Sequence, residues 1–184
     1  MAMTWTKPQA HTTRADQESA VFDALFQQYW PRLCEMLFRL TGDWPEAEDL
    51  ALEAFLRLYQ QPPDNDQNLP GWLYRTATNL GLNAIRARKR RQVYEGQAVQ
   101  EDLVALIASA PGQDPARAME KSLERQRVRA VLAALKPRSA QLLLLRYSGL
   151  SYAEIATALQ IAPGSVGTLL ARAEQEFAKK YRFM

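Results

Sequence analysis

The chain has 184 residues, of which 47% are hydrophobic, and this composition excludes wholesale disorder. A single cysteine, Cys34, excludes an internal disulfide, and one histidine, His11, is too little for a His-based metal site or a Cys–His catalytic pair. The sequence has no apolar run of 18 residues and no signal-peptide core. We therefore expect a cytoplasmic protein without membrane segments, metals or cofactors.

The charge is unevenly distributed along the chain, although the net charge is only +3. Residues 18–95 carry 9 basic and 11 acidic side chains, whereas residues 119–184 carry 11 basic and 5 acidic ones, a net charge of +6. The C-terminal third is therefore the better candidate for binding duplex DNA or another polyanion.

The first half of the chain predicts helices only. Residues 1–17 show no hydrophobic period and are expected to form a tail. Apolar residues then recur at helical spacing from Glu18 to Thr41, and Pro31 predicts a kink or break within this helix. Gly42 follows as a helix-ending residue, and Asp43 is the expected N-cap of the next helix.

The second helix, expected at about 44–60, has a core stripe and a separate acidic face. Leu52 and Leu56 lie off the core stripe, beside three carboxylates: Glu48, Asp49 and Glu53. An acidic face with exposed leucines suggests a docking surface for a basic partner helix. The alternative is a solvated face with incidental leucines.

The third helix is expected over 71–91, after a loop at 61–70. Leu73, Ala77, Leu80 and Ala84 fall within an arc of about 60° that forms an apolar seam. A second arc, about 80° wide, carries one indole, two amides and three guanidiniums, and we name it the strand face. Its residues are Trp72, Arg75, Asn79, Asn83, Arg86 and Arg90. These groups can stack a base, bond base edges and neutralise phosphates. The alternative is a solvated basic helix end with Trp72 in the core.

The last third of the chain predicts a helix-turn-helix. Residues 96–118 lack a core of their own and are expected to form a flexible linker. Two helices follow, one ending at Lys136 and a very apolar one at about 139–147. Ser151 and Glu154 then form a capping box for a short helix, a turn runs through 160–163, and a long helix continues to about Arg182.

The outer face of that long helix carries groups that can bind phosphates and base edges: Ser165, Thr168 and Arg172. Non-DNA-binding helical hairpins can imitate this pattern. The pattern therefore indicates DNA binding without excluding a purely structural hairpin.

Taken together, these motifs resemble the extracytoplasmic-function (ECF) group of bacterial sigma factors in the sigma-70 family. Regions 2.1 and 2.2 of that family are similar to FDALFQQYWPRLCEMLFRLTGDWPEAEDLALEAFLRLYQ. Regions 2.3 and 2.4 are similar to GWLYRTATNLGLNAIRARKRR, and region 4 is similar to LAALKPRSAQLLLLRYSGLSYAEIATALQIAPGSVGTLLARAEQEF.

The resemblance implies an all-α chain of two small helical domains, region 2 at 18–95 and region 4 at 119–184, joined by the linker. It also implies RNA polymerase core as a partner: the β′ clamp helices would meet Glu48, Asp49, Leu52 and Glu53, and region 4 would touch the β flap. The strand face would hold the melted −10 element, with a flipped base in the loop at 64–70. Ser165, Thr168 and Arg172 would meet the −35 duplex.

Such a protein is not an enzyme, because the polymerase supplies the chemistry. The resemblance also raises an anti-sigma factor as a further partner, and no membrane contact is expected.

Two departures from the family pattern matter. Leu52 stands where relatives usually carry Gln, so one polar contact to the clamp is missing. Gly167, Leu169, Ala171 and Glu174 occupy positions that often hold Lys, Arg, His and Arg. Phosphate and shape contacts are therefore expected to dominate at the −35 duplex.

Two other functions account for part of this pattern. A helix-turn-helix regulator could bind duplex operator DNA without polymerase, but it would have no need of the strand face. An enzyme with a helical accessory domain is disfavoured by the shortage of His, Cys and clustered acid–base pairs.

Overall fold

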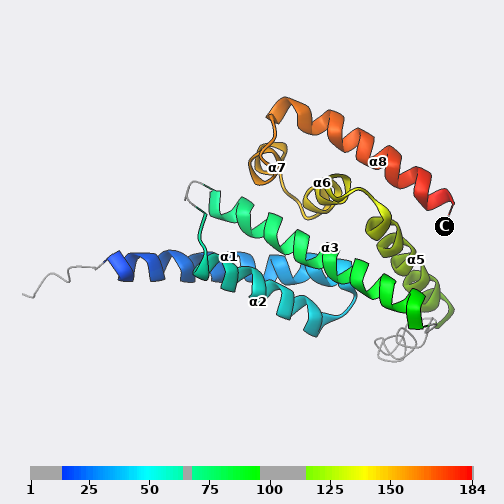
Figure 1. Cartoon of the computed structure of the whole chain (residues 1–184), viewed down its shortest axis with the longest axis horizontal. Helices are drawn as coiled ribbons and strands as arrows, with labels where there is room; N and C mark the ends of the chain where they lie inside the picture. The colour runs from blue at the N-terminus through cyan, green and yellow to red at the C-terminus, as the bar shows by residue number, and fades with distance from the viewer. Residues whose placement is uncertain (1–13, 64–67, 96–114, 184) are drawn as a thin grey trace, which may run out of the picture.

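The computed structural model describes residues 14–63, 68–95 and 115–183, and all regular structure in these ranges is helical (Figure 1). The all-α prediction is therefore confirmed. The helices are α1 (Arg14–Thr41), α2 (Trp44–Gln60), α3 (Leu69–Glu95), α5 (Pro115–Ala134), α6 (Pro137–Tyr147), α7 (Tyr152–Leu159) and α8 (Val166–Arg182), with a 3₁₀ turn, η2 (Pro163–Ser165), before α8.

The turn between α1 and α2 forms as predicted. Gly42 has a φ of +79°, a conformation that favours glycine, and the guanidinium of Arg129 lies where a Cβ would stand. Asp43 caps α2 by accepting a hydrogen bond from the backbone N–H of Glu46 at 2.7 Å. The turn therefore joins α1 and α2 as an antiparallel pair and also contacts α5.

Several helix bounds differ from the sequence prediction, among them those of α3, which runs over Leu69–Glu95 rather than 71–91. The predicted break at Pro31 does not occur, and α1 is one helix of 28 residues. Pro31 is exposed, while Trp30 and Leu33 on either side of it pack into the core, so tertiary contacts hold the helix on both sides of the proline. α1 begins at Arg14, inside the expected tail, and α5 begins at Pro115, inside the expected linker, where proline suits a first helical turn. The rest of that linker lies outside the described residues.

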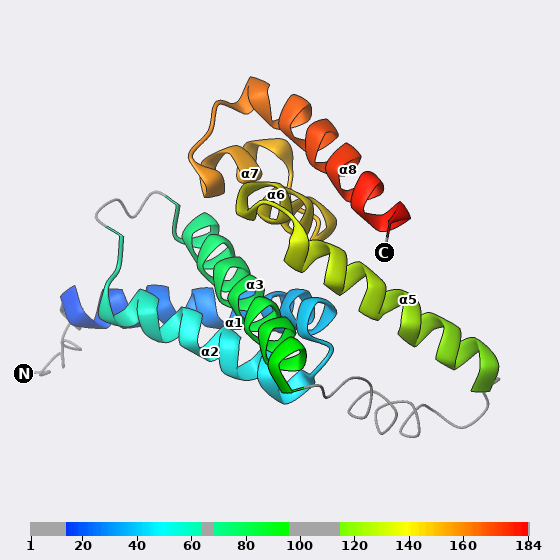
Figure 2. The same ribbon diagram turned by 45° about the vertical axis from the view of Figure 1, so that its right-hand side comes forward.

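α3 is the central helix of the molecule. In Figures 1 and 2 it runs between the α1–α2 pair on one side and the unit formed by α5, α6, α7 and α8 on the other. Its predicted apolar seam faces the interior: Leu73 and Ala77 are fully buried, and Leu80 and Ala84 are half-buried. A second buried stripe was not predicted: Tyr74, Thr78, Leu82 and Ile85.

The second stripe exists because α3 is covered from more than one direction. Thr78 Oγ1 lies 3.8 Å from the sulfur of Met36 on α1, and the ring of Tyr74 meets that of Tyr29 edge-on. A Cβ at Gly81 would stand 2.6 Å from a methyl carbon of Leu40, so glycine is what lets α1 and α3 approach here. A helix covered on several sides loses the one-sided pattern from which sequence analysis predicts a single seam.

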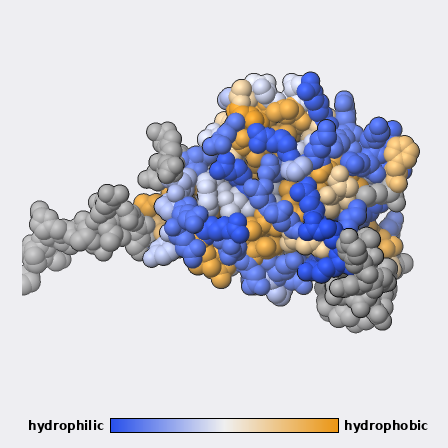
Figure 3. Space-filling model, viewed as in Figure 1, coloured by the Kyte–Doolittle hydropathy of each residue, from blue (hydrophilic) through white to orange (hydrophobic). Residues whose placement is uncertain are grey.

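The hydrophobic core is continuous through both halves of the chain. It includes Phe55 and Leu73 from the first half and Leu142, Ile155 and Leu170 from the second. Within the described residues, no helix is apolar over a length that would cross a membrane. On the face drawn in Figure 3 the surface is mostly hydrophilic and the hydrophobic residues form separate patches.

We expect the two halves to stay together when the connection between them is cut. A protease site introduced within 96–114 should yield two fragments that co-elute on gel filtration, because α3 shares a core with α5, α6 and α7. In 6 M urea the fragments should separate. Separate elution in native buffer would show that the shared core does not hold the halves without the linker.

We also expect the thiol of Cys34 to be inert in the folded chain. Burial raises the pKa of this thiol to about 11, so the reactive thiolate is scarce below that pH. Labelling by a methanethiosulfonate reagent at pH 8 should be about 100-fold slower or more than in urea, and should accelerate as the pH approaches 11. Equal rates in native buffer and in urea would contradict this.

Candidate nucleic-acid interface

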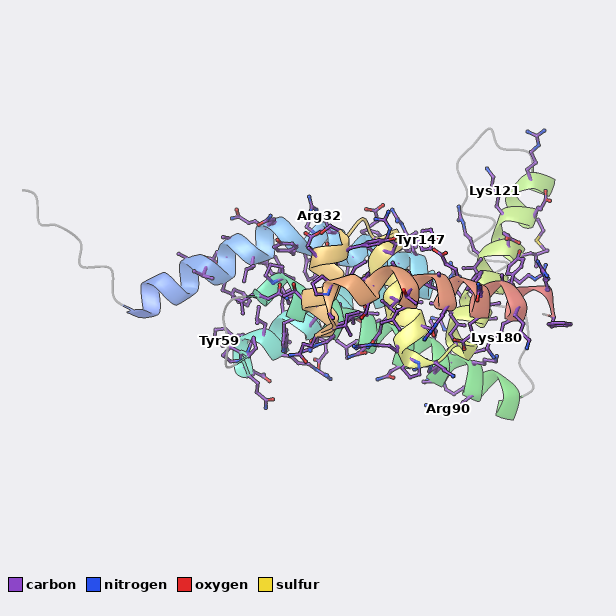
Figure 4. All side chains as sticks on the ribbon, turned by 90° about the horizontal axis from the view of Figure 1, so that it is seen from above. Arg32, Tyr59, Arg90, Lys121, Tyr147 and Lys180 are labelled. Atoms are coloured by element: carbon purple, nitrogen blue, oxygen red, sulfur yellow. The ribbon has the colours of Figure 1, made fainter. Side chains whose placement is uncertain are left out.

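The strand face of α3 is only partly open. Three of its side chains are exposed: Asn79, Asn83 and Arg90. The other three are half-buried: Trp72, Arg75 and Arg86. Figure 4 shows Arg90 at the edge of the molecule, toward the C-terminal end of α3. One helix therefore carries all six groups, but neighbouring elements cover part of the surface they form.

Arg86 is held by the end of α5. Its Nε donates to the carbonyl of Ala133 at 3.2 Å, and its Nη2 donates to the carbonyl of Leu135 at 3.1 Å. Carbonyls in the last turn of a helix lack intrahelical donors and carry partial negative charge. A guanidinium that satisfies two of them stabilises the end of α5 and fixes it on α3.

Asn79 is held by α6. Its Oδ1 accepts a hydrogen bond of 2.5 Å from Nε2 of Gln141. This oxygen keeps a second lone pair and the amide nitrogen keeps its two donors, so Asn79 can still bond a base edge beside Gln141. Gln141 is therefore a functional neighbour of the strand face that sequence reasoning missed, and no local signal could have found it, because the two residues are 62 positions apart.

Trp72 lies partly in the core and partly at the surface, which agrees with both interpretations of it, as a core residue and as a base-stacking residue. It is half-buried and packs against the core with part of its indole, which leaves the remainder accessible. In the loop predicted to hold a flipped base, residues 64–67 lie outside the described residues. At the described end of this loop, the side chain of Asn68 accepts a hydrogen bond from the backbone N–H of Gly71 at 3.1 Å and so caps the start of α3.

The basic run at the end of α3 divides into structural and free cations. Arg88 donates to the carbonyl of Thr41 at 2.9 Å and pairs with Glu46 at 2.5 Å, so it fastens α3 to the turn between α1 and α2. Lys89, Arg90 and Arg91 are exposed. The exposed three can bind a polyanion without disturbing the fold.

The helix-turn-helix has the predicted geometry. Ser151 accepts from the N–H of Glu154, whose carboxylate accepts in turn from the N–H of Ser151 at 2.7 Å, which completes the capping box of α7. These hydrogen bonds to its charged form lower the pKa of Glu154. Gln160 takes the left-handed conformation, with φ of 54°, and ends α7.

α8 presents its predicted outer face to solvent. Ser165, Thr168 and Arg172 are all exposed, one or two turns apart. On its other side Val166 and Leu170 are buried, which fixes the orientation of the helix. Arg172 is followed by the exposed Glu174, so the middle of this surface is close to neutral, as its sequence indicates.

The acidic face of α2 is exposed as predicted. Glu48, Asp49 and Leu52 are exposed, and Glu53 is half-buried and paired with Arg57 at 2.7 Å. The side chain of Leu52 is 45% exposed and that of Leu56 is 43% exposed, which is unusual for leucine. We call Glu48, Asp49, Leu52, Glu53 and Leu56 the docking face.

Tyr59 extends the docking face by one turn and was missed in the sequence analysis. It is 74% exposed and lies at the C-terminal end of α2 in Figure 4. Its ring meets that of Phe22 on α1 edge-on. Its spacing in the sequence could have placed Tyr59 on this face, since Leu52, Leu56 and Tyr59 recur at helical intervals.

No group of three or more His, Cys, Asp and Glu side chains that could hold a metal ion comes together among residues 14–63, 68–95 and 115–183. The buried side-chain nitrogen and oxygen atoms in the same ranges all have hydrogen-bond partners.

Comparison with known proteins gives the same division of the chain. The family model Sigma-70 region 2 matches residues 25–91, which include α2 and most of α3. The family model Sigma-70, region 4 matches residues 125–177, which include α6, α7 and most of α8.

Named relatives are RNA polymerase sigma factors. SigL of Mycobacterium tuberculosis, an ECF RNA polymerase sigma factor, is 31% identical over 160 residues, which cover 85% of this chain and 86% of SigL. SigE of Mycolicibacterium smegmatis, also an ECF factor, is 31% identical over 157 residues. They cover 84% of this chain and 59% of SigE, so this chain spans less than two thirds of that relative.

A solved structure shares the fold. The sigma factor RpoE from Bartonella quintana, solved in complex with the anti-sigma factor NepR, matches with a TM-score of 0.52 at 22% identity. The match covers 88% of this chain and 97% of that chain. From the two region models and the identity to SigL over most of both proteins, the chain belongs to the ECF group of the sigma-70 family.

Proposed function

We propose that this chain binds RNA polymerase core, directs it to promoters and holds the melted strand during transcription initiation. The observation that carries the proposal is the presence of three separate surfaces on one chain. These are the docking face of α2, the strand face of α3 and the exposed hydroxyls and guanidinium of α8. A helix-turn-helix regulator that binds only duplex DNA has no use for the first two.

The docking face is proposed to meet basic residues of a polymerase helix. Exposed carboxylates supply charge complementarity, and Leu52, Leu56 and Tyr59 supply apolar area at the centre of the contact. Region 2 is proposed to span 18–95, the linker 96–118 and region 4 119–184.

The strand face is proposed to bind the unpaired −10 element. Arg90 would neutralise a phosphate, Asn79 and Asn83 would bond base edges, and Trp72 would stack with its accessible part. Arg75 and Arg86 lie on the same face and would add phosphate contacts. Such binding needs no catalytic residue, because the polymerase joins the nucleotides.

α8 is proposed to bind the −35 duplex with little base-specific readout. Ser165 and Thr168 can donate to phosphates or accept from base edges, and Arg172 is the exposed cation of this surface. With so few donors for bidentate base contacts, DNA shape would contribute much of the specificity. An anti-sigma factor is a further proposed partner, since the structure of RpoE was solved with one.

Reversing two charges on the docking face should weaken polymerase binding. Asp49→Arg with Glu53→Arg should reduce affinity for core about tenfold or more, because two attractive contacts become repulsive. The measurement is competition for core against a labelled wild-type chain. The control, Asp23→Arg with Glu120→Arg, makes the same charge change at exposed positions of α1 and α5. Equal affinity of both double variants would remove the docking face from the proposal.

Alanine substitutions at two residues of the strand face should impair strand binding in different ways. Arg90→Ala deletes a phosphate contact, so binding of the −10 strand by holoenzyme should weaken for all sequences and the salt slope should fall by about 0.7. Asn83→Ala should leave the salt slope unchanged and relax sequence preference, because an amide contacts base edges. Promoters selected by transcription of genomic fragments provide the oligonucleotides. If Asn83→Ala keeps the full sequence preference, α3 does not read the bases through this residue.

A further inference from the structure

The C-terminal end of α8 carries planar and basic groups that the proposed function does not use. α8 ends beside α5 in Figures 1 and 2, and the backbone carbonyl of Tyr181 accepts a hydrogen bond of 2.7 Å from Nη2 of Arg127 on α5. We propose that this surface binds single-stranded RNA, with bases stacked on its planar groups and phosphates held by its cations. We name it the RNA edge, and its residues are Arg127, Lys179, Lys180, Tyr181, Arg182 and Phe183.

The guanidinium of Arg127 is fixed against an aromatic ring. Its central carbon lies 4.2 Å from the centroid of the Tyr181 ring, and the hydrogen bond to the carbonyl of Tyr181 holds it there. Arg127 is nevertheless exposed, so the face of the guanidinium that is turned away from the ring is open to solvent. An unpaired base can stack on a guanidinium plane, and little further side-chain entropy is lost when that plane is already immobilised.

Phe183 supplies a second stacking surface. It follows directly after α8, and its side chain is 82% exposed. A ring that stands almost entirely in water gains free energy when a planar partner covers it. Stacking of this kind tolerates any sequence, because every base has a π face. Phe183 and Arg127 therefore offer two stacking surfaces that both lie close to Tyr181.

The cations of the RNA edge are available to phosphates. The side chains of Lys179, Lys180 and Arg182 form no hydrogen bond or ion pair with the residues that the structure describes. Lys179 and Arg182 are exposed, and Lys180, which Figure 4 labels near the C-terminal end of α8, is half-buried. A polyanion can therefore pair with these three cations without breaking an existing contact.

The two carboxylates nearest to the RNA edge are engaged within the protein. Glu124 accepts from the phenol of Tyr181 at 2.5 Å, and Glu176 accepts from the hydroxyl of Ser139 at 2.7 Å. The hydrogen bond to Glu124 raises the pKa of Tyr181, so the phenol stays uncharged at neutral pH. Four cations against two carboxylates leave a net charge of +2 at this end of α8.

The shape and chemistry of the RNA edge fit an unpaired strand. An open groove of about 420 Å³ is lined by Lys179, Lys180, Glu176 and Phe183, so cations and an aromatic ring face the same space. Duplex nucleic acid hides its base faces in the helical stack and could use only the cations. Outside a melted promoter, the strands that expose base faces in a cell are RNA, and RNA is therefore the occupant that we assign.

The RNA edge is separate from both surfaces proposed for promoter DNA. The strand face belongs to α3, and Lys179 lies two helical turns beyond Arg172, about 10 Å along the axis of α8. One chain could therefore hold an RNA strand and the −35 duplex at the same time. This inference goes beyond the proposed function and does not rest on it.

The binding test uses a fluorescent uridine decamer and the full chain, with affinity measured by fluorescence anisotropy. Because the strand face could also hold a single strand, all variants carry Asn83→Ala and Arg90→Ala. In this background Arg182→Ala with Phe183→Ala should weaken binding about tenfold, since one stacked base and one phosphate contact are lost.

The matched control removes the same two residue types elsewhere. Arg57→Ala with Phe38→Ala changes exposed positions of α2 and α1 and should leave the affinity for the decamer unchanged. Equal affinities of the two variants overturn the inference, and so does the absence of decamer binding in the background chain.

A competition experiment separates stacking from charge attraction alone. An RNA duplex at the same phosphate concentration should displace the fluorescent decamer about fivefold less well than an unlabelled uridine decamer does, because its bases cannot reach Arg127 and Phe183. Displacement by the duplex at least as effective as that by the decamer would show that phosphates alone are held, and it overturns the inference.

Crosslinking locates the strand on the unmodified chain. A uridine decamer with 5-iodouridine at a central position, irradiated with near-ultraviolet light, should crosslink within residues 177–183, where its bases stack on aromatic rings. The crosslinked peptides are identified by mass spectrometry. Crosslinks confined to other segments of the chain overturn the inference, whatever the affinity.

Discussion

Burial of α3 on two sides is the constraint on which the rest of the structure depends. The helix gives Tyr74, Thr78 and Gly81 to the contact with α1, and Asn79 and Arg86 to the contact with the C-terminal unit. Because a single helix is shared, the hydrophobic core runs through both halves of the chain. The strand face meets the C-terminal unit at two of its residues, Asn79 and Arg86.

Arginine side chains organise the helix ends around this core. Arg88 binds the last carbonyl of α1, Arg86 binds carbonyls at the end of α5, and Arg138 binds the last carbonyl of α7 at 2.7 Å. Each supplies donors to acceptors that a helix leaves unsatisfied, with charge of the sign that the helix dipole favours. A planar guanidinium can bond two such acceptors at once, which a lysine ammonium does with less geometric control. These three arginines therefore have a structural role at the helix ends.

The two surfaces proposed to bind promoter DNA differ in how rigidly they are presented. α8 is fixed from its buried side by Val166 and Leu170 and keeps its outer residues free. On the strand face, Asn79 and Arg86 are engaged with other parts of the same chain, whereas Asn83 and Arg90 are exposed. A polar group without a partner in a half-buried place is unfavourable, and the half-buried Arg86 finds its acceptors in the carbonyls of Ala133 and Leu135.

The sequence by itself determined the features that depend on near neighbours. Helix periodicity, the caps at Asp43 and Ser151 and the exposed leucines of α2 are set within a few residues, so they were predicted correctly from spacing and residue type. Only the tertiary structure decided the continuation of α1 through Pro31, the second buried stripe of α3 and the structural use of Arg86 and Arg88. The stripe and the arginine contacts join residues more than 40 positions apart, and Trp30 beside Pro31 packs on Phe55 of another helix. A local pattern contains no information on which helix will supply such partners.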